Sequence, residues 1–282
     1  MNDKESFALV RKPSSAVEKT APRAKRILAG MVADTLEVAE RQVGKTNPEA
    51  LFRMGAKYYY GTDAPKDYKE ALKWFRMAAA KKHASAQNTL GVMFLQGYGV
   101  DRDCQQALKW FLTAAEQNDS CAQGNLGVAY KNGFGVEKSD MQAAWWFRKA
   151  AEQNDAQAQY QLGVCYDNGE GVTKNFSEAA KWFRQAAEQG HAIAQCFLGY
   201  YYNHGEGVTK DLIEAAKWYQ KSAEQGYATA QHNLGLCYAQ GRGVPRDFAE
   251  AEKWFRKAVE QGNKLAQGDL TLLLSEMEKS GK

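Results

Sequence analysis

The chain has 282 residues, of which 44% are hydrophobic and 25% are charged, a composition typical of a folded protein. The formal net charge is +4, and residues 1–46 carry 9 basic and 6 acidic side chains, so the remaining 236 residues are nearly neutral. Because nucleic-acid surfaces need clustered positive charge, this balance argues against a nucleic-acid-binding protein, and we expect no nucleic acid among the partners.

The sequence predicts a cytoplasmic protein without a membrane span. Its most apolar early stretch, residues 27–39, is interrupted by Asp34 and Glu37, and no apolar run of a signal peptide precedes it. The odd number of cysteines and the absence of CxxC or Cys/His ligand spacing argue against disulfides and zinc. These cysteines are Cys104, Cys121, Cys165, Cys196 and Cys237, and we expect them to be buried or half-buried thiols.

Two segments precede the regular part of the chain. Residues 1–23 are polar and lack a period, which predicts disorder. Residues 24–46 contain an amphipathic helix from Ala24 to Val43. This helix either caps the element that follows or docks onto a partner, and the sequence is compatible with both.

From Pro48 to Asn263 the sequence repeats every 36 residues, which defines six repeats. The repeated pairs are Leu90-Gly91, Leu126-Gly127, Leu162-Gly163, Leu198-Gly199 and Leu234-Gly235, with Met54-Gly55 one period earlier. A tryptophan recurs with the same spacing, as Trp74, Trp110, Trp146, Trp182, Trp218 and Trp254. A large aromatic ring that recurs at the same position of every repeat is typical of the packing core of that repeat.

The sequence of each repeat predicts a pair of helices. Ala158, Leu162 and Tyr166 follow the spacing of one helical face, and this pattern stops at Gly169. A second helix starts at an Asp, Ser or Asn with Glu or Gln three residues later, as in Asn175 and Glu178, which predicts a capping box in every repeat. Gly190, Gly226, Gly262, Asn118 and Asn154 end the second helices.

Helical hairpins that bury their faces only against one another form an all-α solenoid. Residues 264–282 begin like a seventh first helix and then become polar, which is typical of a C-terminal capping helix.

The segments A-x-A-Q-x-x-L-G-x-x-Y, N-G-E-G-V, A-x-K-W-[FY] and A-A-E-Q-G, read from Ala156 to Gly190, resemble the Sel-one-like repeat family, relatives of tetratricopeptide repeats. The resemblance covers 216 of the 282 residues. It implies a right-handed α/α superhelical solenoid whose first helices line a concave groove. The first repeat departs from the pattern, with Gly61-Thr62-Asp63-Ala64 in place of G-x-G-V, so its turn could differ.

The resemblance makes one side of the first helices a candidate groove for a protein or peptide partner. Its central column is apolar and contains Val92, Val128, Val164, Tyr200 and Leu236. The columns on either side contribute Asn88, Tyr160 and His232, and Lys131, Asp167 and Asn203. An apolar floor with polar margins suits an extended or helical peptide. The alternative is that the valine column packs against the adjacent first helix.

Nothing in the sequence predicts a catalytic centre, a metal site or a cofactor. The usual nucleophile and metalloprotease motifs are absent. His83 and His191 stand between repeats, three periods apart, while His204 and His232 could approach each other on neighbouring first helices. Without a carboxylate or thiolate at ligand spacing, exposed or hydrogen-bonded histidines are the simpler interpretation.

We therefore expect a non-enzymatic scaffold or adaptor. Members of the resembled family are known as scaffolds in signalling, protein quality control and bacterial host interaction. Two alternatives stay open. One is a β-lactam-binding or β-lactam-hydrolysing enzyme, like the cysteine-rich members of the family, although this chain lacks their regular cysteine pairs. The other is a spacer that presents a partner-binding segment, residues 7–43. The sequence specifies neither the partner nor the oligomeric state.

Overall fold

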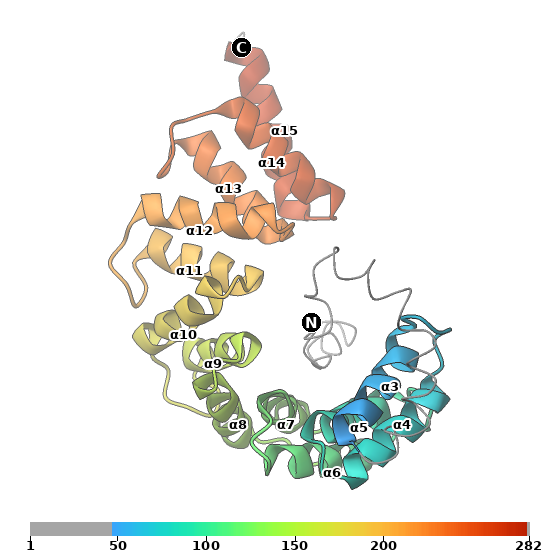
Figure 1. The fold of residues 1–282 in the computed structure, drawn as a ribbon. Coiled ribbons are helices and arrows are strands. Elements are labelled where there is room, and N and C mark those ends of the chain that lie inside the picture. The colour runs from blue at the N-terminus through green and yellow to red at the C-terminus, as the bar shows by residue number, and fades with distance from the viewer. Residues whose placement is uncertain (1–46, 281–282) are drawn as a thin grey trace. The chain divides into compact units, whose positions relative to one another are not determined.

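The computed structural model describes residues 47–280, and this part of the chain is built of α-helices (Figure 1). They are α3 (Pro48–Tyr60), α4 (Tyr68–Ala80), α5 (Ala84–Gln96), α6 (Cys104–Ala115), α7 (Ser120–Asn132), α8 (Asp140–Glu152), α9 (Ala156–Asn168), α10 (Phe176–Glu188), α11 (Ala192–His204), α12 (Leu212–Glu224), α13 (Ala228–Gln240), α14 (Phe248–Glu260) and α15 (Lys264–Ser280). The expected segments 1–23 and 24–46 lie outside the described residues. Within the described range, every helix is too short or too polar to cross a membrane.

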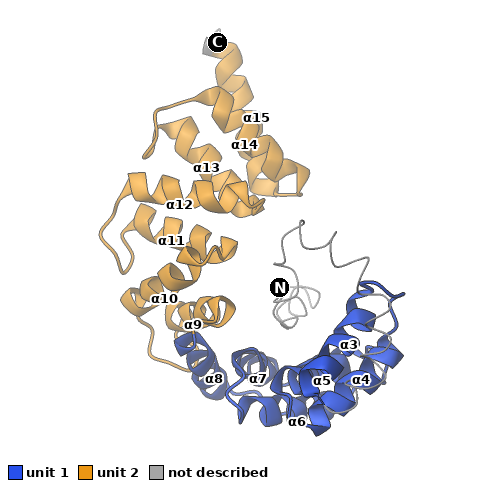
Figure 2. Cartoon of the chain, in the orientation of Figure 1, with its two compact units in different colours: residues 1–153 blue, residues 154–282 orange. Residues whose placement is uncertain are grey.

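The chain divides into two compact units, residues 1–153 and residues 154–282 (Figure 2). The described part of the first unit contains α3 to α8, and that of the second contains α9 to α15. Within each unit, every odd-numbered helix packs against the next even-numbered helix, which packs in turn against the following hairpin. This arrangement confirms the expected all-α solenoid of helix-turn-helix repeats.

Caps at both ends set the length of the first helices, except that in α13 the N-cap residue Tyr227 makes no side-chain hydrogen bond. In α9, the Asp155 side chain accepts a hydrogen bond from the amide of Ala158, and the helix stops at Gly169, whose φ is 78°. The amide of Gly169 donates to the carbonyl of Cys165, so a left-handed residue closes the last turn. The first helices α3, α5, α7, α11 and α13 end at glycines in the same way.

Each second helix begins at the predicted N-cap. The N-cap side chain bonds to the first amides of the helix, but the reciprocal bond to the side chain three residues later is missing. In α4, the Asp67 side chain accepts from the amides of Lys69 and Glu70. The amide of Asp67 donates to the carbonyl of Tyr58 at 2.9 Å. The prediction that this amide donates to the Glu70 carboxylate is therefore wrong. Glu70 instead pairs with Lys73, and equivalent Glu–Lys pairs occur in α10, α12 and α14. The backbone bond to Tyr58 ties the two helices of the hairpin together.

The ring at the centre of each hairpin is the phenylalanine or tyrosine that follows the tryptophan. These rings are at most 3% exposed and comprise Phe75, Phe111, Phe147, Phe183, Tyr219 and Phe255. The tryptophans are half-buried at the core's edge, except for Trp254, which is 7% exposed. The tryptophans therefore pack on the core as expected, as Trp74 and Trp218 do, while the adjacent ring is the fully enclosed one. Cations approach the outer side of the tryptophans, and Lys221 Nζ lies 4.0 Å from the centroid of Trp218.

In four of the turns the second glycine of G-x-G touches the preceding repeat, at Gly99, Gly135, Gly207 and Gly243. A Cβ atom on Gly207 would lie 2.2 Å from the carbonyl oxygen of Phe176, so no larger residue fits. In the first repeat Asp63 takes this position with φ of 61°, the same left-handed conformation.

The last helix, α15, packs one apolar face on α14. Ala266, Leu270 and Leu273 are buried in a cluster with Phe255 and Ala258. On the remaining surface of α15, Leu265 and Leu272 are 72% and 70% exposed. The predicted capping role of residues 264–282 rests on this packing and stays a prediction.

Candidate functional site

The predicted central column differs in exposure between the two units. In the first unit Val92 and Val128 are only 2% and 4% exposed. In the second unit Val164 and Leu236 are half-buried, and Tyr200 is 40% exposed. Val92 and Val128 therefore offer no open floor for a partner, in line with the alternative that the valine column packs against the adjacent first helix. The second unit, in contrast, keeps apolar side chains of this column at the surface.

Direct contact between α5 and α7 explains the closed column of the first unit. Asn125 Nδ2 donates to Asn88 Oδ1 at 2.8 Å, and both side chains are at most 2% exposed. Asn88, predicted at the groove margin, is thus an internal packing residue. Lys131, on the opposite margin, is half-buried near the end of α7.

The other predicted margin residues lie in the second unit and have individual partners. His232 is 7% exposed, and its Nε2 lies 2.6 Å from Oδ2 of Asp269 on α15, so it joins the last hairpin to the last helix. Tyr160 is half-buried and stacks on His191, with ring centroids 4.9 Å apart. Asn203 is half-buried on α11. His204 stacks on Tyr200 rather than pairing with His232.

Tyr200 stands at the centre of an aromatic and acidic corner between α9 and α11. Its hydroxyl lies 3.4 Å from Oε1 of Glu206, and the ring of His204 stacks on it with centroids 4.0 Å apart. The neighbouring Tyr201 is buried, and its hydroxyl donates to Asp167 Oδ1 at 2.6 Å. Partial burial, together with the Glu206 and Asp167 charges, raises the pKa of Tyr200. Two carboxylates from successive repeats thus lie near enough to one exposed ring to act on its pKa.

We call the surface formed by α9, α11, α13 and α15 in residues 154–282 the first-helix layer. One position of each helix in this layer belongs to the same column of the repeat. These positions are Val164, Tyr200, Leu236 and Leu272. Leu272 extends the predicted column by one period and was missed by the sequence reasoning, although the 36-residue period could have found it.

The second helices carry a separate set of exposed apolar side chains. On α8, Met141 and Trp145 are 65% and 46% exposed, and Lys149 Nζ lies 4.2 Å from the ring centroid of Trp145. Trp145 occupies a column that holds lysine in the other five repeats. On α12, Ile213 is 58% exposed. These residues offer controls for experiments on the first-helix layer.

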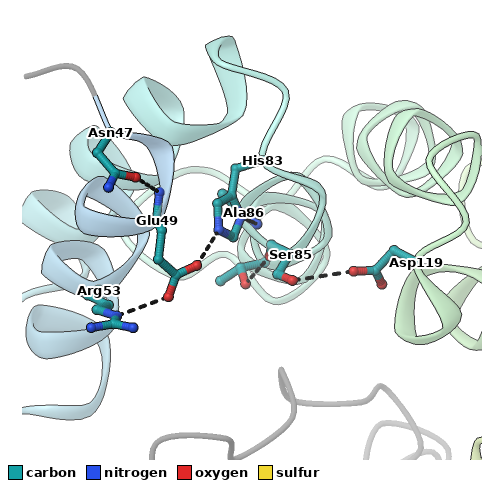
Figure 3. A network of polar contacts seen from close by, with 8 residues as sticks. Asn47, Glu49, Arg53, His83, Ser85, Ala86 and Asp119 are labelled. Carbon is teal, nitrogen blue, oxygen red and sulfur yellow. Dashed lines mark hydrogen bonds and ion pairs between the residues drawn. The ribbon is translucent and has the colours of Figure 1, made fainter.

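His83 is an N-cap, a role that the sequence reasoning did not assign. Figure 3 shows the network around it. Its Nδ1 accepts from the amide of Ala86 at 3.2 Å, and its Nε2 lies 3.1 Å from Oε2 of Glu49 on the preceding repeat. Glu49 is also bound to Arg53. The hydrogen bond from His83 is the main cause that lowers the pKa of Glu49.

The same link recurs between other repeats. Ser85 Oγ donates to Asp119 Oδ2 at 3.4 Å (Figure 3). Asp119 in turn caps α7 by accepting from the amide of Ala122. Burial raises the pKa of Asp119 despite these hydrogen bonds. In the second unit His191 caps α11, and its Nε2 lies 3.1 Å from Oε1 of Gln157. The two histidines are therefore structural caps that join neighbouring repeats.

A column of buried glutamines also joins the repeats. Gln195 Nε2 donates to the carbonyl of Ala187 in the preceding hairpin at 3.0 Å, while its Oε1 accepts from Gln225 at 2.7 Å. The same glutamine pair is formed by Gln87 and Gln117, and by Gln231 and Gln261. The repeated Q of the A-x-A-Q and A-E-Q segments thus has a structural role.

The metal-ligating residue types of the described part of the chain are dispersed, and the cysteines among them lie in the interior or at its edge. No group of three or more His, Cys, Asp or Glu residues in residues 47–280 is placed to hold a metal ion. Cys165, Cys196 and Cys237 are buried, as expected, and Cys104 and Cys121 are half-buried. Burial raises the pKa of Cys196 to about 12 and that of Cys237 to about 11.

Comparison with known proteins gives a family and a set of similar solved structures. The family model for the Sel1 repeat matches residues 48–83, 84–119, 122–155, 156–191, 192–227 and 228–263. A protective antigen present in uropathogenic Escherichia coli strains, displaying an SLR fold, is 36% identical with a TM-score of 0.79. The alignment covers 86% of this chain and 52% of that protein, so the chain spans about half of its length.

The second structure is a Sel1 repeat protein from Oxalobacter formigenes, which is 37% identical with a TM-score of 0.71. The alignment covers 78% of this chain and 86% of that protein. A search of curated proteins found no match.

Proposed function

Because this chain belongs to the Sel1 repeat family, whose members generally serve as protein–protein interaction scaffolds, we propose that it is a non-enzymatic adaptor. Its first-helix layer in residues 154–282 holds a segment of a partner protein. The observation that carries this proposal is the exposure of Tyr200 and Leu272 in one repeated column, at 40% and 70%. Exposed apolar side chains in register supply area to bury against a partner.

The margins of the layer supply selectivity. Asp167 and Asn203 are half-buried beside the apolar column. Polar groups at the rim of an apolar surface choose a partner because unmatched hydrogen-bonding groups weaken the wrong complex. The hairpins hold these side chains on helices that are capped at both ends, so the surface is organised before binding.

The chemistry of the described residues favours binding over catalysis. A cysteine nucleophile acts as the thiolate, and the raised pKa of Cys196 and of Cys237 keeps both thiols protonated at neutral pH. None of the five cysteines, all of which lie in the described residues, forms a disulfide, which favours a reducing, cytoplasmic setting.

The test is affinity capture with quantitative mass spectrometry on three folded proteins. They are the native chain, Tyr200→Ser/Leu272→Ser in the first-helix layer, and Ile213→Ser/Trp145→Ser on the second helices. All four positions are at least 40% exposed, so the substitutions leave the hairpin cores intact. Partners kept by the second-helix variant and lost by the first-helix variant support the proposal. Loss from the second-helix variant alone places the binding surface elsewhere.

A further inference from the structure

Charge is segregated between the two helices of each repeat in residues 154–282. The first helices α9, α11 and α13 contain no lysine or arginine. Each of the second helices α10, α12 and α14 contains at least two. The other cations of the described part of this unit lie in the turns and near the two ends of α15, at Lys264 and Lys279. The helices α9, α11 and α13 therefore present Asp167 together with aromatic and aliphatic side chains and no lysine or arginine.

The carboxylates beside Tyr200 have hydrogen-bonding capacity left. Asp167 accepts from the hydroxyl of Tyr201, and Glu206 lies within hydrogen-bonding distance of the hydroxyl of Tyr200. A carboxylate has about four acceptor positions, so one hydroxyl leaves most of them available. The ion pairs described in this unit involve other residues, on the second helices and at His232–Asp269 and Arg246–Glu276.

An exposed aromatic ring between two carboxylates complements a cationic side chain. A guanidinium or ammonium group gains from the face of a tyrosine ring and from charge-assisted hydrogen bonds to the carboxylates. The same column continues with Leu236 and Leu272, which offer apolar contact beyond the charged corner.

We propose that the first-helix layer of residues 154–282 binds a basic and apolar segment of a partner protein. An arginine or lysine of that segment lies against Tyr200 between Asp167 and Glu206, and its apolar side chains pack on Leu236 and Leu272. This inference rests on the proposed adaptor function and adds the chemical class of the partner segment.

The test uses the full chain and fluorescence anisotropy with defined synthetic peptides. The probe is a short labelled peptide in which leucine alternates with arginine. In the matched peptide, citrulline replaces arginine and removes the charge while keeping the shape. The protein variant Asp167→Asn/Glu206→Gln neutralises the corner but retains acceptors for both tyrosine hydroxyls, and circular dichroism verifies its fold.

We expect the native chain to bind the arginine peptide about tenfold more tightly than the citrulline peptide. The variant should lose most of this ratio, and added salt should reduce it in the native chain. Equal affinity for both peptides, an arginine preference that survives in the variant, or no binding of either peptide would overturn the inference.

The design separates the inference from the adaptor function itself. Binding of both peptides with equal affinity, weakened by Tyr200→Ser/Leu272→Ser and unchanged by Ile213→Ser/Trp145→Ser, retains the first-helix layer as a docking surface and rejects only the charge preference. Binding that Tyr200→Ser/Leu272→Ser leaves unchanged rejects the docking surface as well.

Discussion

Gly163 of α9 lies directly against the ring of Phe183 of α10, and a Cβ atom on this glycine would be 2.6 Å from Cδ1 of the ring. The Leu-Gly pair thus lets the core ring approach the backbone of the first helix. Gly163→Ala should reduce the free energy of unfolding by about 1–3 kcal/mol, because the ring must shift within a packed core. Urea denaturation followed by circular dichroism measures this change.

A matched control is available on the last helix. A Cβ atom on Gly268 of α15 would meet nothing within 4 Å, and this glycine is exposed. Gly268→Ala should therefore stabilise the protein by up to about 1 kcal/mol through helix propensity. Equal effects of the two substitutions would contradict a specific glycine–ring contact.

Lys82 is held in a left-handed conformation, with φ of 62°, where the last three repeats have Gly190, Gly226 and Gly262. A side chain makes this conformation cost about 1–2 kcal/mol. Lys82→Gly should recover part of that cost and raise the midpoint of urea denaturation. Gly190→Ala should lower it, although its Cβ would meet nothing within 4 Å. A midpoint that falls in Lys82→Gly would show that the lysine side chain itself stabilises the turn.

The buried Gln195 and its partner Gln225 should be energetically coupled. Gln195→Leu keeps the volume of the side chain but removes the bonds to Gln225 and to the carbonyl of Ala187. A double-mutant cycle with Gln225→Ala should give a coupling free energy of about 1 kcal/mol, the usual size for one hydrogen bond. Additive effects of the two substitutions would mean that the pair contributes no stability of its own.

The link between Glu49 and His83 should make stability depend on pH. The pKa of Glu49 is lowered in the folded chain from an ordinary value of 4.5. A carboxyl group with a depressed folded pKa stabilises the fold above its unfolded pKa, and this stability is lost as the pH falls through the folded pKa. We therefore expect the midpoint of urea denaturation to fall in acid, and to fall less in Glu49→Gln. The side chain is largely exposed, so the difference should be small.

The sequence predicts the repeat boundaries and caps well because these depend on local chemistry. Gly169 and Asp67 act at a helix end and at a helix start, as their residue types indicate. Packing between helices is harder to predict. Trp182 and Phe183 are adjacent and both apolar, yet Phe183 is the enclosed ring, and it lies against Gly163 of the first helix.

The exposure of the candidate site could not be predicted from one column. Val128 and Tyr200 occupy the same position of the repeat, yet one is 4% exposed and the other 40%. The difference arises from neighbouring helices, because α5 and α7 contact each other through Asn88 and Asn125. Such pairing depends on side chains that the 36-residue period does not fix.

The most direct test of the adaptor proposal is site-specific photo-crosslinking in the native cells. A benzoylphenylalanine replaces Tyr200 in one protein and Ile213 in another, which compares two exposed positions, one before and one after the same turn. We predict a discrete covalent adduct to a partner protein from position 200 and none from position 213. Adducts from position 213 alone, or identical adducts from both, would contradict binding at the first-helix layer.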